Sequence, residues 1–175
     1  VFGLDGDTPP RTPTHGRTVL SLAWSPDGAR LASAGGSQVR VWGAGDEPLQ
    51  TFAPARRGED ALAVAWSPAG DLLAARNDDR LLLFPGGEAP ARPVVGPIGP
   101  QLRLVFAPDG RELASVSVRG AAGRWRGDLS LATAVLQESG HPPGEVNDLA
   151  WCPDGPLALA REDHSVELRT ATDLI

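Results

Sequence analysis

Short apolar runs recur along the chain every 40 to 45 residues, and each run ends at an aromatic residue. These aromatic residues, which we call the anchors, are Trp24, Trp66, Phe106 and Trp151. Each anchor is followed by a short sequence that contains Pro and Gly, and in three of the four cases this is Pro-Asp-Gly. Proline sets φ near −65° and glycine accepts positive φ, as tight turns require. The pattern therefore predicts four buried strands, each followed by a turn.

Further apolar runs follow each turn, at 31–34, 72–75, 113–116 and 157–160, and again at 39–42, 81–84 and 166–168. A second aromatic series, formed by Trp42, Phe84 and Trp125, lies 18 or 19 residues behind the anchors. The stretches 48–52 and 131–136 supply a shorter fourth strand. No helical period persists beyond one turn. Four strands in each repeat of this length are typical of the antiparallel blades of a β-propeller, so we predict an all-β fold.

The repeat divides the chain into about four blade units, which we place at residues 15–52, 57–95, 100–136 and 141–175. Residues 1–14 are expected to form the outer strand of a preceding or closing blade. Residues 1–175 then form one propeller segment that starts and ends within a blade. Such a segment should leave strand edges unpaired and apolar faces exposed. We expect it to be part of a larger ring, completed by flanking sequence or by two copies that associate, although four blades could also close alone.

The sequence resembles the WD-repeat (WD40) family of β-propellers. The resemblance rests on His15, on Trp24-Ser-Pro-Asp-Gly28 with Val39-Arg-Val-Trp42, and on Gly140-His141 ahead of Trp151-Cys-Pro-Asp-Gly155. It implies a hydrogen-bonded set of a loop His, a strand Ser or Thr, a turn Asp and a third-strand Trp in each blade.

The repeats are degenerate, because no unit carries all four residues of that set. The first unit has His15, Ser33 and Trp42, but Gly36 and Ser37 stand at the Asp position. Packing should therefore hold the blades more than this network does. We expect the seven aromatic residues of the two series to be core anchors, because they fall on the buried strand period. They are Trp24, Trp42, Trp66, Phe84, Phe106, Trp125 and Trp151.

Charge and composition narrow the functional classes. The chain has 16 basic residues, all Arg, and 22 acidic residues, for a net charge of −6. An acidic chain with no basic block does not fit nucleic acid or an anionic membrane as a partner. No apolar run approaches the ~20 residues that span a bilayer, and no signal peptide is evident, so a cytoplasmic location is expected. Abundant Ala, Arg, Gly and Pro without Lys, Met or Tyr indicates a GC-rich, bacterial source.

Residues able to support catalysis are few. The single cysteine, Cys152, excludes an internal disulfide and a Cys-based zinc site, and we expect an inert, partly buried thiol. His15, His141 and His164 lie in different loops without metal-ligand spacing. The adjacent residues 163–165, Asp-His-Ser, cannot converge on one substrate atom. We predict no catalytic residue, no metal site and no cofactor, and hence a protein that is not an enzyme.

Two acidic pairs, Asp78-Asp79 and Glu162-Asp163, could attract a cation. The favoured interpretation is that they are turn residues, with one carboxylate accepting hydrogen bonds from the turn backbone.

The remaining candidate is a surface. In the family that the sequence resembles, the loops that join outer to inner strands and second to third strands lie on one side of the disc, and binding residues concentrate on such loops. Ten residues fall there and form a possible partner-binding face: Arg17, Arg57, Glu59, Asp60, Arg76, Asn77, Arg80, Arg119, Glu162 and His164.

We therefore predict a non-catalytic protein–protein interaction scaffold or sensor module, a segment of a larger signalling or regulatory protein. Its partner would be another protein or a fused catalytic or signalling domain, with possible self-association to complete the ring. An alternative is a propeller lobe that gates a hydrolase or peptidase domain, and another is a small-molecule site in the central channel. The third-strand ending Val39-Arg-Val-Trp42 favours the scaffold.

Overall fold

The computed structural model describes residues 12–52, 61–70, 72–76, 80–84, 92–95, 101–117, 122–126, 135–140, 146–152 and 156–169. Within these ranges there is no helix, and the strands form four antiparallel sheets in which sequence neighbours pair. The all-β prediction is confirmed. We name the sheets blade 1 (β1–β4), blade 2 (β5–β8), blade 3 (β9–β12) and blade 4 (β13–β15). The strands are β1 (Ser21–Trp24), β2 (Leu31–Gly35), β3 (Gln38–Trp42), β4 (Pro48–Phe52), β5 (Ala61–Trp66), β6 (Leu72–Arg76), β7 (Arg80–Phe84), β8 (Arg92–Val95), β9 (Gln101–Phe106), β10 (Glu112–Ser117), β11 (Ala122–Arg126), β12 (Val135–Gly140), β13 (Val146–Trp151), β14 (Leu157–Arg161) and β15 (Val166–Arg169).

The first strand of every blade ends at its aromatic anchor, as the apolar pattern predicts. The turns after three of the anchors are closed by backbone hydrogen bonds of 2.9 Å, in which Gly28, Gly70 and Gly110 donate to the residue three positions earlier. These glycines have φ of 67°, 91° and 71°, which is the left-handed region that a side chain disfavours. The predicted turns therefore form at these three places, while residues 153–155 lie outside the described ranges.

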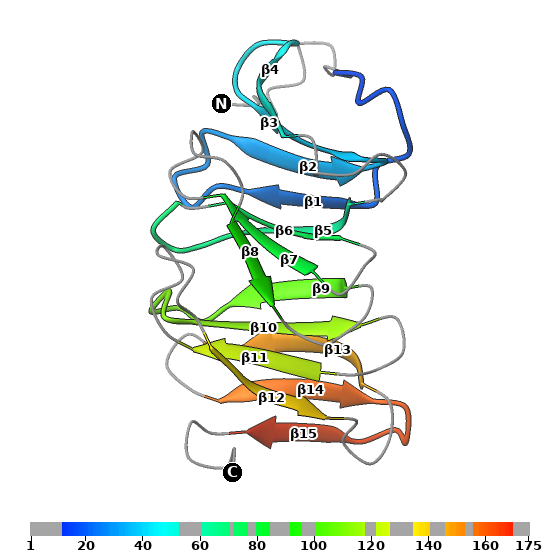
Figure 1. Ribbon diagram of the computed structural model, residues 1–175, viewed down its shortest axis with the longest axis vertical. Coiled ribbons are helices and arrows are strands. Elements are labelled where there is room, and N and C mark those ends of the chain that lie inside the picture. Colours follow the sequence, from blue (N-terminus) through cyan, green and yellow to red (C-terminus); the bar gives the residue numbers. More distant parts are fainter. Residues whose placement is uncertain are drawn as a thin grey trace, which may run out of the picture.

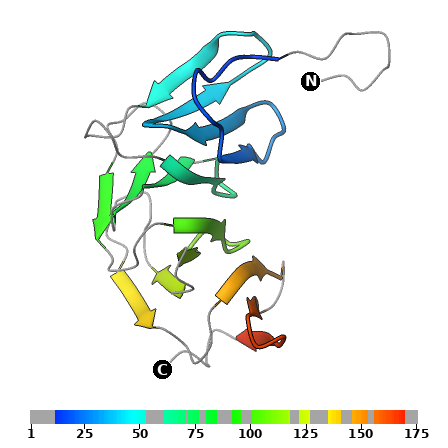
Figure 2. The same ribbon diagram turned by 90° about the vertical axis from the view of Figure 1, so that its right-hand side faces the viewer.

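The four blades stack along an arc in chain order, with blade 1 and blade 4 at its two ends (Figure 1). The first strand of each blade lies on the inner, concave side of the arc, and β4, β8 and β12 lie on the outer side (Figure 2). The described blades form an open arc (Figure 2).

The core lies between facing blades. Alternate residues of each strand point to the preceding or the following blade, because side chains in a strand alternate between its two faces. Between blades 1 and 2 the rings of Phe52 and Phe84 meet with centroids 4.5 Å apart. The cluster at this interface contains Ala32, Ala34, Val39, Val41, Val64, Trp66, Leu82 and Phe84. A second cluster, between blades 3 and 4, contains Ala114, Val116, Val146, Leu149, Leu157 and Leu159.

Side chains also link the inner edges of adjacent blades. The Ser21 hydroxyl accepts a hydrogen bond of 3.2 Å from the backbone N–H of Val64, and the Trp66 indole donates one of 2.9 Å to the Ala23 carbonyl. β1 and β5 are the inner edge strands of their sheets, so these bonds pair backbone groups that no strand of their own blade reaches.

The expectation that all seven aromatic anchors are core residues is wrong for Trp24. Trp42, Trp66, Phe84 and Trp125 are buried, and Phe106 and Trp151 are partly buried, but Trp24 is 49% exposed. Its neighbour Ala23 packs against the cluster between blades 1 and 2, so the Trp24 side chain lies on the other face of β1.

Two smaller expectations also need correction. Cys152 is exposed rather than partly buried. The residues that follow the other three anchors, Ser25, Ser67 and Ala107, are buried. The described fourth strand of blade 3, β12, covers Val135–Gly140 and so extends beyond the predicted 131–136, of which residues 131–134 lie outside the described ranges. Its last residues are polar or glycine and pair with β11 through their backbone, so an apolar pattern could not locate them.

Candidate functional site

The two loop sets predicted to bind a partner meet in blade 1. The segment that precedes β1 packs against the β2–β3 turn so closely that a methyl group at Gly35 would overlap the Thr18 carbonyl oxygen. A methyl group at Gly36, where φ is 52°, would lie 2.9 Å from Cγ of Arg17. The Leu20 N–H donates a hydrogen bond of 2.8 Å to the Ala34 carbonyl and ties the segment to β2. Arg17 is exposed on this surface.

The β14–β15 turn presents two more of the predicted residues. The Asp163 carboxylate accepts hydrogen bonds from the Ser165 N–H, at 3.0 Å, and from the Ser165 hydroxyl. These bonds hold the pKa of Asp163 below its usual value, with the hydroxyl as the main cause. His164 takes φ of 68°, and the side chains of Glu162 and His164 are exposed. The interpretation of Asp163 as a turn residue is confirmed, while Asp78 and Asp79 lie outside the described residues.

The other predicted residues are placed in part or not at all. Arg76 ends β6 and Arg80 begins β7, so they flank the β6–β7 turn, but their side chains are not described. Five residues lie outside the described ranges: Arg57, Glu59, Asp60, Asn77 and Arg119. The β2–β3 and β14–β15 turns lie on the same side of the arc, the right-hand side of Figure 1. We call this side, which carries Arg17, Glu162 and His164, the loop surface.

A buried histidine lies beneath the loop surface in blade 1. The His15 ring packs at 6.4 Å from the Trp42 ring, and the Trp42 indole donates a hydrogen bond of 2.7 Å to the Ser33 hydroxyl. Neither ring nitrogen of His15 has a hydrogen-bond partner in the described part of the chain. Of the hydrogen bonds among His, Ser, Asp and Trp that the family resemblance implies, blade 1 thus forms the one between Trp42 and Ser33. In blade 3 the corresponding Ser115 and Trp125 side chains, both buried, form none.

His15 makes stability depend on pH. Burial, and secondarily the positive charge of Arg40, lower the His15 pKa from its usual 6.5. As the pH falls, His15 is therefore protonated near pH 6.5 in the unfolded chain but only at a lower pH in the folded chain. The contribution of neutral His15 is complete above pH 6.5 and is lost as the pH falls from there through the folded-state pKa.

We expect the midpoint of urea unfolding to fall between pH 7.5 and 5, and the variant His15→Gln to lose most of this dependence. The carboxyl groups of Asp27 and Asp163, whose pKa values are also lowered, titrate near or below 3.8 and act outside this window. An unchanged pH profile in His15→Gln would contradict the assignment.

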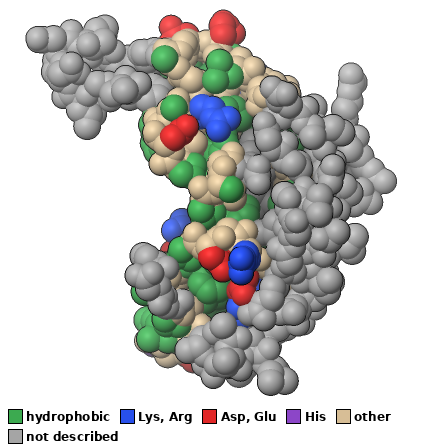
Figure 3. All heavy atoms as spheres, turned by 90° about the vertical axis from the view of Figure 1, so that its left-hand side faces the viewer, with side chains coloured by type: hydrophobic (Ala, Val, Ile, Leu, Met, Phe, Trp, Pro, Cys, Tyr) green, Lys and Arg blue, Asp and Glu red, His purple; other side chains and the backbone are tan. Residues whose placement is uncertain are grey.

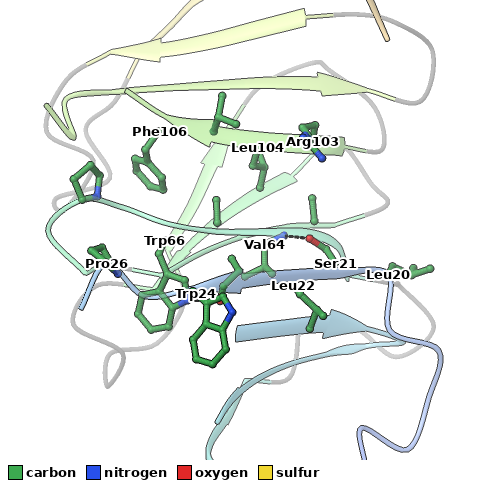
Figure 4. Close-up of a pocket in the computed structure, with 15 residues that line it drawn as sticks. Leu20, Ser21, Leu22, Trp24, Pro26, Val64, Trp66, Arg103, Leu104 and Phe106 are labelled. Atoms are coloured by element: carbon green, nitrogen blue, oxygen red, sulfur yellow. Dashed lines mark hydrogen bonds between the residues drawn. The ribbon is translucent and has the colours of Figure 1, made fainter. Parts of the chain in front are cut away.

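A groove runs along the concave side of the arc, over the inner strands of blades 1, 2 and 3. It encloses about 710 Å³, and its lining comes from β1, β5 and β9 and from the turns that follow β1 and β5. Leu20 and Arg103 lie near one end, and Pro26, Trp24, Trp66 and Phe106 lie toward the other (Figure 4). The apolar pattern predicts these strands as core, and the alternative of a small-molecule site in the central channel came without any named groove residue. In the three blades that line the groove, the residue three before the anchor lies on this wall, but these residues, Ser21, Ala63 and Arg103, share no side-chain type.

The groove has one charged lining residue, Arg103, and otherwise presents apolar side chains and the Ser21 hydroxyl. The guanidinium of Arg103 pairs with the Asp148 carboxylate at 2.9 Å, and both side chains are about half exposed. Such an exposed pair contributes about 0–1 kcal/mol and leaves the groove with little net charge. These groups offer van der Waals contact and hydrogen bonding to a bound molecule.

The turns that contain Pro and Gly lie on the opposite side of the arc, the left-hand side of Figure 1, which faces the viewer in Figure 3. Among the described residues of this side, hydrophobic side chains lie among separate acidic and basic ones (Figure 3). In the described ranges no group of three or more His, Cys, Asp or Glu side chains could hold a metal ion. The same ranges contain no helix long and apolar enough to cross a membrane.

The fold and this surface define the class: a repeat protein of antiparallel blades whose inner strands and loops face a shared concave side. Two segments, residues 8–43 and 133–168, match the family model described as "WD domain, G-beta repeat". They include β1–β3 and β13–β14, so the matches fall at both ends of the arc. These two segments are therefore WD40 repeats, as the sequence resemblance indicated. No curated protein sequence matches the chain.

Proposed function

We propose that this chain is a non-catalytic protein-interaction scaffold or sensor module, a segment of a larger signalling or regulatory protein. WD40 repeats in general mediate binding between proteins. The observation that carries the proposal is the close packing of the β1-leading segment on the β2–β3 turn, which joins two loop sets into one surface. Loops supported by a rigid scaffold are where binding residues concentrate.

The charges on the loop surface favour a polar protein partner. Arg17 is exposed at blade 1, and Glu162 and His164 are exposed at blade 4. Arginine anchors protein interfaces well because its planar guanidinium pairs with carboxylates through two parallel hydrogen bonds. A partner that spans the arc would place an acidic group near Arg17 and a basic group near Glu162.

Site-specific photo-crosslinking tests this proposal. A photoreactive amino acid is introduced at Arg17, at His164 and, as a control, at Asp109, which is exposed in the β9–β10 turn on the opposite side. We expect the first two variants to form an adduct with the same protein in the cells that naturally contain the chain. The Asp109 variant should form none with it.

A charge-reversal variant gives the energetic check. Arg17→Glu should weaken partner binding by about 1–3 kcal/mol, which is roughly a 5- to 150-fold increase in Kd measured with the crosslinked partner. Asp109→Arg, a reversal on the other side, should leave Kd unchanged. Equal crosslinking from all three positions, or equal Kd values for the two variants, would refute binding at the loop surface.

A further inference from the structure

The segment that leads into β1, residues 12–20, buries one side chain against blade 1, and that side chain is a histidine. His15 is 5% exposed, whereas the other residues of the segment are exposed, apart from the half-buried Pro13. Hydrogen bonds also hold the segment, and in one of them the Arg40 guanidinium donates to the Thr14 carbonyl at 2.9 Å. His15 is therefore the side chain on which the attachment of the segment mainly depends.

The His15 ring lies in a place where a charge is unfavourable. It packs on the Trp42 ring, and neither of its nitrogens has a hydrogen-bond partner among the described residues. A neutral imidazole leaves one donor and one acceptor unsatisfied there, whereas a protonated ring would leave two donors and a full charge. Burial of an unpaired charge costs much more than burial of an unpaired neutral polar group.

The charged groups around the ring do not compensate a proton on it. Burial is the main cause that lowers the His15 pKa, the positive charge of Arg40 adds to it, and backbone groups of β2 and of His15 itself act in the opposite direction without outweighing them. Arg17, two residues further on, is also positive and is exposed. β2, the β2–β3 turn and β4 carry no titratable side chain. Asp46 and Glu47 lie in the exposed β3–β4 turn, at the other end of β3.

The same segment carries the blade 1 part of the loop surface. Gly16 takes φ of 79° directly after His15, so the chain turns there between the buried ring and the exposed Arg17. Arg17 in turn lies against Gly36 of the β2–β3 turn. The segment forms no strand, since β1 begins at Ser21, so it can leave the surface while the blade stays folded.

We propose that protonation of His15 releases residues 12–20 from blade 1 and so removes Arg17 from the loop surface in acid. In the released segment His15 binds a proton with its usual pKa of 6.5, but in the attached segment only at a lower pH. Release is therefore suppressed above pH 6.5 and increases as the pH falls from there through the pKa of the attached state. The usual pKa sets the limit: at pH 5 the ratio of released to attached segments rises by up to about 30-fold.

A nitroxide spin label measures the release in the chain without a partner. The label is placed at Thr18→Cys, an exposed position of the segment, after Cys152→Ser removes the native thiol. We expect the ratio of mobile to immobile label to rise reversibly by up to about 30-fold between pH 7.5 and 5. The far-UV circular dichroism spectrum should stay unchanged, because no strand is lost. A control label at Ala69→Cys, in the exposed β5–β6 turn, should show no pH dependence.

Variants of the histidine assign the response to this one ring. His15→Phe keeps an aromatic ring against Trp42 and binds no proton, so its label at Thr18 should stay immobile at both pH values. His15→Gln provides the same comparison with a smaller neutral side chain. Both variants retain His141 and His164, so a response caused by those residues would persist in them. A wild-type label that does not respond to pH, or a response that persists in both variants, would overturn the proposal.

The consequence for binding rests on the proposed function and is measured separately, with the partner found by crosslinking. Kd should rise at pH 5 by the factor by which the attached fraction falls, and this rise should be absent in His15→Phe. Comparing the two chains removes any titration of the partner itself. Equal pH dependence of Kd in both chains would refute the link to binding, while the label would still establish the release. Failure to find any partner would refute the proposed function alone.

Discussion

Replacing Trp66 with alanine lowers the free energy of unfolding by about 3–5 kcal/mol, the usual cost of deleting a large buried aromatic side chain. Trp66 is buried between blades 1 and 2, and its indole donates a hydrogen bond to the Ala23 carbonyl. The guanidinium of Arg30 also lies over its ring, 4.7 Å from the centroid. The variant loses the packing, the bond across the blades and this stacking together. Urea unfolding followed by far-UV circular dichroism measures the loss.

The chain contains a matched control for this prediction. Trp24 occupies the equivalent position of β1 but is half exposed, so Trp24→Ala should change stability by only about 0.5 kcal/mol. Similar losses in the two variants would mean that the inter-blade packing of Trp66 has been assigned too large a role.

Replacing Glu112 with alanine lowers the free energy of unfolding by a similar amount, about 3–5 kcal/mol, because it leaves a buried guanidinium unpaired. The Glu112 carboxylate accepts a hydrogen bond of 2.6 Å from Nε of Arg124 and also pairs with its terminal nitrogen. The Arg124 side chain is 5% exposed. Only a small part of this side chain reaches water, which limits how far solvent can replace the lost carboxylate.

The control for this second prediction is the double variant Glu112→Leu with Arg124→Leu. Removing both charges together removes the desolvation cost as well as the attraction, so the double variant should be close to the wild type in stability. It should lose only the contact of the guanidinium with the Trp151 ring, which lies 5.6 Å away. A double variant as unstable as Glu112→Ala would show that shape, rather than charge pairing, dominates here.

The sequence was sufficient to predict the strands and their turns because these depend on local patterns. Each first strand ends at an aromatic anchor, and β4 covers the predicted residues 48–52. The turn glycines have the positive φ that their position after Pro required. The family was likewise identifiable, since its motifs are short and contiguous.

The sequence could not predict which anchors are buried, because burial depends on the neighbouring blade. Trp24 and Trp66 stand in nearly identical motifs, yet only Trp66 has a preceding blade packed against it. The groove lined by β1, β5 and β9 could not be predicted either, because it depends on how neighbouring blades are placed. The residues three before the anchors are Ser21, Ala63, Arg103 and Asp148, so no repeated signal marks the groove or the Arg103–Asp148 pair.

The candidate site in blade 1 contains one feature that the sequence could predict and one that it could not. The placement of Arg17 beside the β2–β3 turn agrees with the loop arrangement that the resemblance implied. The degenerate His15–Ser33–Trp42 set could be identified from the sequence, but not the absence of any partner for His15 in the described residues. That follows from the side chains that surround the ring in three dimensions.

The stacking of blades in chain order determines how the molecule opens. Each blade packs mainly on its sequence neighbours, so stability is approximately a sum of blade terms and nearest-neighbour terms. Opening should then start at the two ends and move inward, with the lowest free energy for the outermost strands. In amide hydrogen exchange, β15 should lose protection first and β7 should retain it longest.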